Sequence, residues 1–451
     1  MQTFIQPGRS EWKKLLARPV IDAAALEQKV KTILNEVKTG GDASVKFFTK
    51  QFDGIALDEL LVTEAEINAA EKELPIELKQ AIQQAATNIQ AFHEKQAGVV
   101  EIIETMPGVQ CWRKSVGIEK VGLYIPGGTA PLFSTLLMLA IPAKIAGCKE
   151  IVLCTPPAPL SAGRGAGGEV NPAILFAAKT VGVTKIFKAG GVQAIAAMAY
   201  GTDTIPQVYK IFGPGNQYVT CAKQLIQKDG IAIDMPAGPS EVAVYADDTA
   251  NPAFVAADLL SQAEHGADSQ VILVVSRESG VGSQESSSVR AESIIAAIKD
   301  EIEKQLAQLP RKEIAAKALE NSKIIIVNNE AEAIDLLNEY AAEHLILSCA
   351  NADAVAEKII NAGSVFLGNY SPESVGDYAS GTNHTLPTNG YAKAYSGVSV
   401  DSFVKKITYQ KLTEEGLKNI GHTVEVMAAA EGLEAHKNAV TIRLREQREK
   451  E

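Results

Sequence analysis

The clearest fold signal of the chain is KVGLYIPGGTAPLFSTLLMLAIPAKIAGCKEIVLCTP, residues 120–156. Two short runs rich in apolar and β-branched residues enclose a longer apolar segment of helical length. A strand, a helix and a second strand in this order are typical of a parallel sheet, because parallel neighbours need a crossover that is usually helical. The segment therefore predicts a β-α-β unit.

The same alternation continues to residue 228, and it starts again after AIDMPAGPSE and runs to SVFLG at residues 364–368. Strands that alternate with helices indicate sheets covered by helices on both faces. We predict an α/β fold with two Rossmann-like, doubly wound parallel-sheet domains and small N-terminal and C-terminal arm segments.

We divide the chain by composition and pattern. The expected parts are an N-terminal arm over residues 1–24, a first discontinuous domain over 25–120 and 240–395, a second domain over 121–239, and a C-terminal arm over 396–451. Amphipathic helices are expected near residues 26–37 and 78–92, and the arm is expected to end in a helix near 424–434 and a charged tail.

Composition excludes several classes of protein. The chain has 46% hydrophobic residues and a net charge of −11, which argues against a nucleic-acid partner. Five single cysteines without a CxxC pair favour reduced thiols. The first residues lack the order of a signal peptide, and polar residues interrupt the longest apolar run at 131–147. We expect a cytoplasmic protein that does not bind membranes.

A GxGxxG pattern, GRGAGG at residues 163–168, does not predict a dinucleotide site. Such a motif has to follow its strand directly and open the next helix. Here prolines intervene, and no acidic residue between Glu169 and Asp203 is available to hold a ribose. We interpret the Gly-rich insert at 158–171 and the Ser-rich stretch near 279–288 as surface loops.

Three other glycine clusters, at residues 125–128, 212–216 and 237–241, follow predicted strands. Ligands bind at this edge of open parallel sheets, and glycine lets them approach the backbone closely. Any one cluster is explained as well by turn formation. Three together favour a ligand site.

Two pairs of polar residues have a spacing that suits metal binding or proton transfer. Gln262 and His265 fall on one helical face and could point at one ion, although two residues alone are weak evidence for a metal. Glu343 and His344 precede an apolar strand, where a carboxylate and an imidazole could act as bases; a solvated loop pair is the alternative.

Further candidates lie toward the C-terminus. Prolines and glycines in the segment 371–384 argue against a regular helix, so Glu373, Asp377 and His384 are expected on a shaped loop. Glu431 and His436 can reach one site only if a helix ends between them.

We assign no role to the remaining histidines. His93 and His422 are expected on polar helix faces.

Eight motifs occur in order between residues 121 and 443, and together they resemble the histidinol dehydrogenase family. They are VGLYIPGGTAPLFST, KIFGPGN, DMPAGPSEV, LLSQAEHGADSQVIL, EHLIL, GSVFLGNYSPESVGDYASGTNH, LPTNGYA and AHKNAVTIR. The two inserts are the departures, and they leave the motifs intact.

The resemblance implies a homodimeric, zinc-dependent enzyme of histidine biosynthesis. It would oxidise L-histidinol through L-histidinal to L-histidine and reduce two NAD. The domain of 25–120 and 240–395 would carry the zinc and catalytic residues, 121–239 would bind NAD, and 396–451 would dimerise and complete the site of the partner.

The resemblance also implies roles for individual residues. Glu343 would activate the attacking water, and His344 would be the general base. The implied zinc ligands are Gln262, His265, Asp377 and His436, the last from the partner subunit. The implied substrate contacts include these residues and His344, with Ser240, Glu373, His384 and Glu431; the implied NAD contacts are Tyr124, Gln193 and Asn216.

Two alternatives remain open at this stage. A zinc amidohydrolase could use the same ligands with Glu343 as water activator and no redox step. A non-catalytic α/β binding protein would tolerate substitution of Glu343 and His344.

Overall fold

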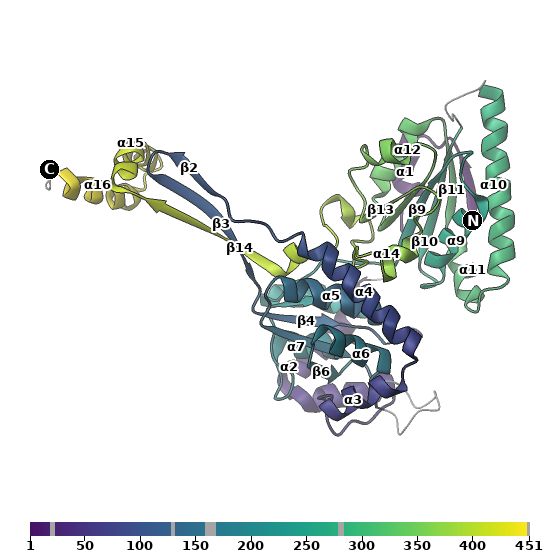
Figure 1. Cartoon of the computed structure of the whole chain (residues 1–451), viewed down its shortest axis with the longest axis horizontal. Helices are drawn as coiled ribbons and strands as arrows, with labels where there is room; N and C mark the ends of the chain where they lie inside the picture. The colour runs from purple at the N-terminus through teal and green to yellow at the C-terminus, as the bar shows by residue number, and fades with distance from the viewer. Residues whose placement is uncertain (19–22, 128–130, 158–167, 278–283, 449–451) are drawn as a thin grey trace.

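The computed structural model describes residues 1–18, 23–127, 131–157, 168–277 and 284–448. They form two α/β lobes and a long arm that extends away from both (Figure 1). The predicted α/β class with parallel sheets is confirmed. Most of the Gly-rich insert, and residues 279–283 of the Ser-rich stretch, lie outside the described residues. Residues 284–288, predicted as loop, instead begin a long helix.

The first lobe is built on a six-stranded parallel sheet. Its central strands are continuously apolar, as expected for a sheet covered on both faces. In spatial order the strands are β1 (Gln2–Ile5), β11 (Lys323–Val327), β10 (Gln270–Ser276), β9 (Glu241–Ala246), β12 (His344–Ser348) and β13 (Ser364–Leu367).

Helices cover both faces of this sheet. One face packs against α9 (Pro252–Ala263), α10 (Gln284–Leu306) and α11 (Lys312–Glu320). The other packs against α1 (Arg9–Leu15), α12 (Glu330–Tyr340) and α13 (Ala352–Ala356).

The N-terminal segment differs from the expected arm over residues 1–24. β1 pairs in parallel with β11, with Gln2 opposite Lys323, and α1 buries Trp12 and Leu15. The correction has a physical reason: β1 is a four-residue edge strand with no buried residue, so it leaves little hydrophobic signal in the sequence.

The second lobe is built on a five-stranded parallel sheet. Its strands, in spatial order, are β6 (Lys185–Lys188), β5 (Glu150–Thr155), β4 (Lys120–Tyr124), β7 (Lys210–Phe212) and β8 (Ala232–Ile233). One face packs against α3 (Glu64–Glu73), α4 (Ile76–Glu94), α5 (Phe133–Ile145) and α6 (Pro172–Val181), and the other against α2 (Ala23–Asp53), α7 (Gly191–Tyr200) and α8 (Gln217–Ile226).

The helices α2, α3 and α4 correct the expected division of the chain. Residues 25–94 pack on the five-stranded sheet, whereas the sequence pattern assigned 25–120 to the lobe of residues 240–395. An apolar stripe shows that a helix is buried, but it does not show against which sheet. His93, expected on a polar face, is fully buried and donates from Nδ1 to the carbonyl oxygen of Ile89.

The arm is a three-stranded antiparallel sheet that carries two helices at its far end (Figure 1). It comprises β2 (Ile102–Met106), β3 (Val109–Gly117), β14 (Val404–Leu412), α15 (Glu414–Ala430) and α16 (Glu434–Arg448). Residues 102–117 therefore belong with the C-terminal arm, and the expected charged tail is helical. Among the described helices, none is long and apolar enough to span a membrane.

Candidate active site

Glu343 and His344 lie where α12 turns into β12. The helix ends at Tyr340, and Ala341 adopts a left-handed conformation with φ of 53° that redirects the chain. His344 then begins the strand. Both side chains are buried, so the solvated loop pair considered from the sequence is excluded.

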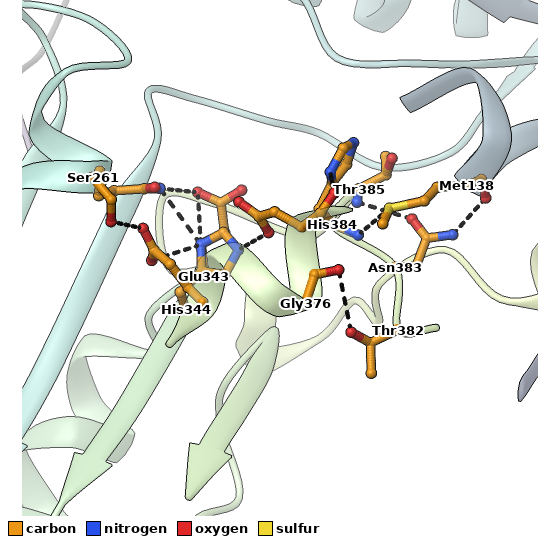
Figure 2. Close-up of polar contacts among 12 residues, drawn as sticks. Met138, Ser261, Glu343, His344, Gly376, Thr382, Asn383, His384 and Thr385 are labelled. Atoms are coloured by element: carbon orange, nitrogen blue, oxygen red, sulfur yellow. Dashed lines mark hydrogen bonds and ion pairs between the residues drawn. The ribbon is translucent and has the colours of Figure 1, made fainter. Parts of the chain in front are cut away.

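Two polar side chains and one backbone N–H contact these two residues. His344 Nε2 lies 3.2 Å from Asp377 Oδ1, and Gln262 Nε2 donates to Glu343 Oε2 at 3.3 Å. The backbone N–H of Glu241 donates to the same Glu343 oxygen at 3.0 Å. Figure 2 shows Glu343 and His344 side by side at the start of their strand. The sequence-predicted pair is thus held by residues from α9, β9 and the segment after β13.

The segment 371–384 contributes two carboxylates that lie close to His344. Residues 373–378 form the short helix α14 (Glu373–Tyr378), where a loop was expected, because Pro372 precedes its first turn and Gly376 is tolerated in so short a helix. Glu373 accepts a hydrogen bond from Ser261, and its Oε2 lies 3.9 Å from His344 Nδ1.

His384 connects this segment to the other lobe. Its Nδ1 donates to the carbonyl oxygen of Asp377 at 2.8 Å, and its Nε2 lies 2.8 Å from the hydroxyl of Thr135 on α5. Since Nδ1 carries the proton, the hydroxyl of Thr135 donates to Nε2 in the neutral ring. Figure 2 shows the neighbouring contacts of Asn383 and Met138 that accompany this link.

Burial and charge shift the titration of the cluster. Burial raises the pKa of Glu343 to about 8 and that of Glu373 to about 7, although His344 opposes both shifts. Burial disfavours charge on His344, but the surrounding carboxylates, Glu343 foremost, raise its pKa to about 10. Burial likewise opposes charge on Asp377, yet His344 lowers the pKa of that carboxyl. Burial therefore disfavours negative charge on Glu343 and Glu373, while the carboxylates together favour a proton on His344.

The residues suit a divalent cation on one side of the cluster. Gln262 Oε1 is buried and has no hydrogen-bond partner. Burial lowers the pKa of His265, which lies two residues past the end of α9, and the nearby carboxylate of Asp377 opposes this shift. Amide oxygen, imidazole and carboxylate together fit zinc. Within the described ranges, no three His, Cys, Asp or Glu residues are grouped so that they could hold a metal ion.

Glu431 and His436 do not join this cluster in their own chain. The helix α15 ends at Ala430, Gly432 has φ of 72°, and α16 starts at Glu434, so a helix does end between them as the prediction requires. Glu431 directly follows α15 and His436 lies in α16, and these two helices are at the far end of the arm, away from the two lobes (Figure 1). Within one chain they are therefore separate from the polar cluster.

The expected NAD contacts lie at the carboxyl edge of the five-stranded sheet. Tyr124 ends β4, and its hydroxyl accepts a hydrogen bond from the N–H of Gly191 at 3.0 Å. Gln193 is buried in the first turns of α7, and its Oε1 has no partner. Asn216 caps α8 with its side-chain oxygen, which leaves its amide N–H groups for a ligand.

A pocket connects this edge to the polar cluster. Its space of about 490 Å³ includes a part open to solvent. The 213–215 turn lines one side, and Ser240, Glu343 and His384 line the other. Two of the glycine clusters predicted from the sequence thus meet at one pocket.

The histidinol dehydrogenase family model matches residues 16–444. The chain belongs to the histidinol dehydrogenase family. A histidinol dehydrogenase of Bacteroides fragilis is 60% identical over 446 residues and covers 99% of both chains. The chloroplastic histidinol dehydrogenase of Arabidopsis thaliana is 51% identical, over 97% of this chain and 90% of that protein.

A solved histidinol dehydrogenase structure from Elizabethkingia anophelis has the same fold. It superposes with a TM-score of 0.93 at 54% identity, over 99% of both chains. Membership of the histidinol dehydrogenase family makes the chain an oxidoreductase of histidine biosynthesis.

Sequence reasoning missed several residues that organise this histidinol dehydrogenase site. Ser261 and Thr135 hold Glu373 and His384, and Arg18 pairs with the buried Glu241. A charged residue at the head of the apolar run EVAVYA was a usable signal for Glu241. The other three residues carry no local signal, because their partners are far away in the sequence.

Proposed function

We propose that the protein oxidises L-histidinol through L-histidinal to L-histidine and transfers the two hydrides to two NAD. The observation that carries the proposal is the buried pair of Glu343 and His344: Glu343 lines a pocket shared by the two lobes, and His344 Nε2 lies 3.2 Å from Asp377 Oδ1. Membership of the histidinol dehydrogenase family supports L-histidinol as the substrate.

The chain's own residues divide the proton chemistry. His344 accepts the proton of the alcohol and later that of the aldehyde hydrate, and Asp377 orients its ring from 3.2 Å. Glu343 holds the water that attacks the aldehyde, with its carboxylate fixed by the N–H of Glu241. Glu373 and His384 support this pair, and we propose them as secondary substrate contacts.

Zinc would be held by Gln262, His265 and Asp377, with His436 from a second copy as the fourth ligand. The buried, unpartnered oxygen of Gln262 supports this assignment. A bound zinc would supply positive charge that anchors the imidazole and amine of histidinol and favours the neutral ring of His344. Ser240 and the second copy's Glu431 would contact the substrate. The active form would then be a homodimer with shared sites, and we place it in the cytoplasm.

NAD would lie along the carboxyl edge of the five-stranded sheet. The unpartnered Gln193 oxygen and the free amide N–H groups of Asn216 support contacts there, beside the hydroxyl of Tyr124. No GxGxxG turn serves this edge in the sequence, so we expect weak NAD binding.

The test is a stoichiometric assay with a metal analysis. Purified protein is given L-histidinol and NAD, and absorbance of the reduced nicotinamide is compared with histidinol consumed. We expect two NAD reduced per histidinol and stoichiometric zinc. Hydrolysis of an amide without NAD reduction would instead indicate the amidohydrolase, and the absence of both activities would favour a binding protein.

A further inference from the structure

Arg18 makes a buried contact between the N-terminal segment and the start of β9. Its guanidinium donates to both carboxylate oxygens of Glu241, at 2.8 and 2.9 Å. The side chain of Glu241 is 1% exposed and that of Arg18 is 14% exposed. A planar guanidinium matches a carboxylate in this two-bonded arrangement, and an ammonium cannot reproduce it.

The same guanidinium also holds the turn that precedes Glu343. It donates to the carbonyl oxygen of Tyr340 at 2.6 Å and lies 3.9 Å from the centre of the Tyr340 ring. The Tyr340 hydroxyl in turn donates to Gln270 at 3.1 Å. Arg18 therefore fixes the last residue of α12, three positions before Glu343.

Both contacts of Arg18 lead to the carboxylate of Glu343. Glu241 supplies the N–H that donates to Glu343 Oε2, and Tyr340 sets the direction of the backbone from which Glu343 extends. Without a cation beside it, Glu241 would be a buried charge with no ionic partner, and the start of β9 would have to rearrange.

We propose that Arg18 is a positioning residue for Glu343, acting through the carboxylate of Glu241 and the carbonyl of Tyr340. Its catalytic consequence rests on the proposed function, in which Glu343 holds the water for aldehyde oxidation. In that step water adds to the aldehyde carbon to form the hydrate. The hydrate transfers a hydride to NAD, and its hydroxyl proton passes to His344. The alcohol step needs no such water and depends less on Arg18.

The decisive variant is Arg18→Lys, which keeps the charge and loses the two-bonded geometry. The full-length protein turns over L-histidinol and NAD in the presence of semicarbazide, which traps released aldehyde. Misplacement of a reacting group by ~1 Å costs about 100-fold. We therefore expect aldehyde oxidation to fall about 10- to 100-fold and the NAD reduced per histidinol to fall from two toward one.

Two further variants calibrate this ratio. Glu343→Gln shows the full effect of losing the carboxylate, and Glu241→Gln removes the ion pair from the other side. Arg9→Lys is the matched control, because Arg9 lies in the same segment, is exposed, and pairs only with Asp335 among the described carboxylates. A ratio that stays at two in Arg18→Lys and Glu241→Gln, while Glu343→Gln lowers it, overturns the proposal.

A second readout does not depend on activity. Amide hydrogen exchange at Glu241, whose N–H donates to Glu343, should accelerate about tenfold in Arg18→Lys, while exchange at Val244 in the same strand stays unchanged. Equal acceleration at both amides means that Arg18 only stabilises the fold. If the wild type reduces no NAD, the proposed function fails, and the exchange result still decides whether Arg18 positions Glu343.

Discussion

The two ends of the chain were both expected to be arms, and they differ sharply in how they are buried. The N-terminal end is part of the six-stranded lobe, where Trp12 is 5% exposed. The C-terminal end lies outside both lobes, and Met427 and Leu433 are 60% and 43% exposed. The first end therefore stabilises the lobe of its own chain, whereas the second leaves apolar side chains exposed, as the proposed homodimer requires.

The largest expected effect is a loss of turnover, and it comes from a substitution in the six-stranded lobe. His344→Asn should lower turnover about 10²–10⁴-fold, because it removes the general base while leaving the fold and the metal ligands in place. Steady-state NAD reduction and a metal analysis measure both properties. The control is His422→Asn, an exposed histidine on α15. Turnover near that of the wild type would show that His344 is not the general base.

The next effect contrasts the two ends directly. Trp12→Ala empties a buried site and loses the hydrogen bond from Nε1 to the Pro7 carbonyl, so we expect a loss of about 3–5 kcal/mol in unfolding free energy. Leu433→Ala should change lobe unfolding by less than about 0.5 kcal/mol and should weaken association of two copies. Urea unfolding followed by circular dichroism, with sedimentation, measures both. Similar unfolding losses would show that the ends are equivalent.

Complementation tests whether the arm serves a second copy. His436→Ala should lose zinc and at least about 100-fold of activity, as expected when a metal site is impaired. Co-expressed with His344→Asn, it should recover about a quarter of wild-type activity, because half the dimers are mixed and each holds one intact site. No recovery in mixed dimers would mean that each site uses histidines of one chain.

The smallest expected effect is a change in how stability depends on pH, and it should arise in the six-stranded lobe and not in the arm. Burial raises the pKa of Asp258 on α9 to about 7. The native state then holds a proton that the unfolded state releases above about pH 4, so stability falls as pH rises from about 4 to 7. Asp258→Asn should remove most of this loss, and Asp300→Asn on the exposed face of α10 should not. Parallel stability curves for both variants would contradict the assignment.

Much of the fold was predictable because its strands are local apolar runs. EVAVYA and QVILVVS are buried along their whole length, and each became a strand of the central sheet. The pair Glu343 and His344 was predictable because the next residues form such a strand. The helix expected near 424–434 was misplaced, because α15 spans Glu414–Ala430 and Gly432 lies beyond its end with φ of 72°.

The unpredicted features depend on distant partners. β2 is exposed along its whole length, and it is a strand because it pairs with β3, so no buried face marks it in the sequence. Arg18 lies in an unremarkable segment, and only the fold brings it to Glu241. The expected contacts of Glu431 and His436 require a second chain. The sequence shows the spacing of these two residues, but it does not show which site they would reach.

The pairing of β1 with β11 also has a consequence for synthesis on the ribosome. β1 is made first, yet Gln2 has no neighbour to pair with until Lys323 has been translated. At about 5–20 residues per second, that delay is roughly 15–60 s. The second lobe can be complete in that time, while the first still has an open edge. Nascent chains should therefore be most prone to misassociation late in translation, after one lobe has folded and before the other closes.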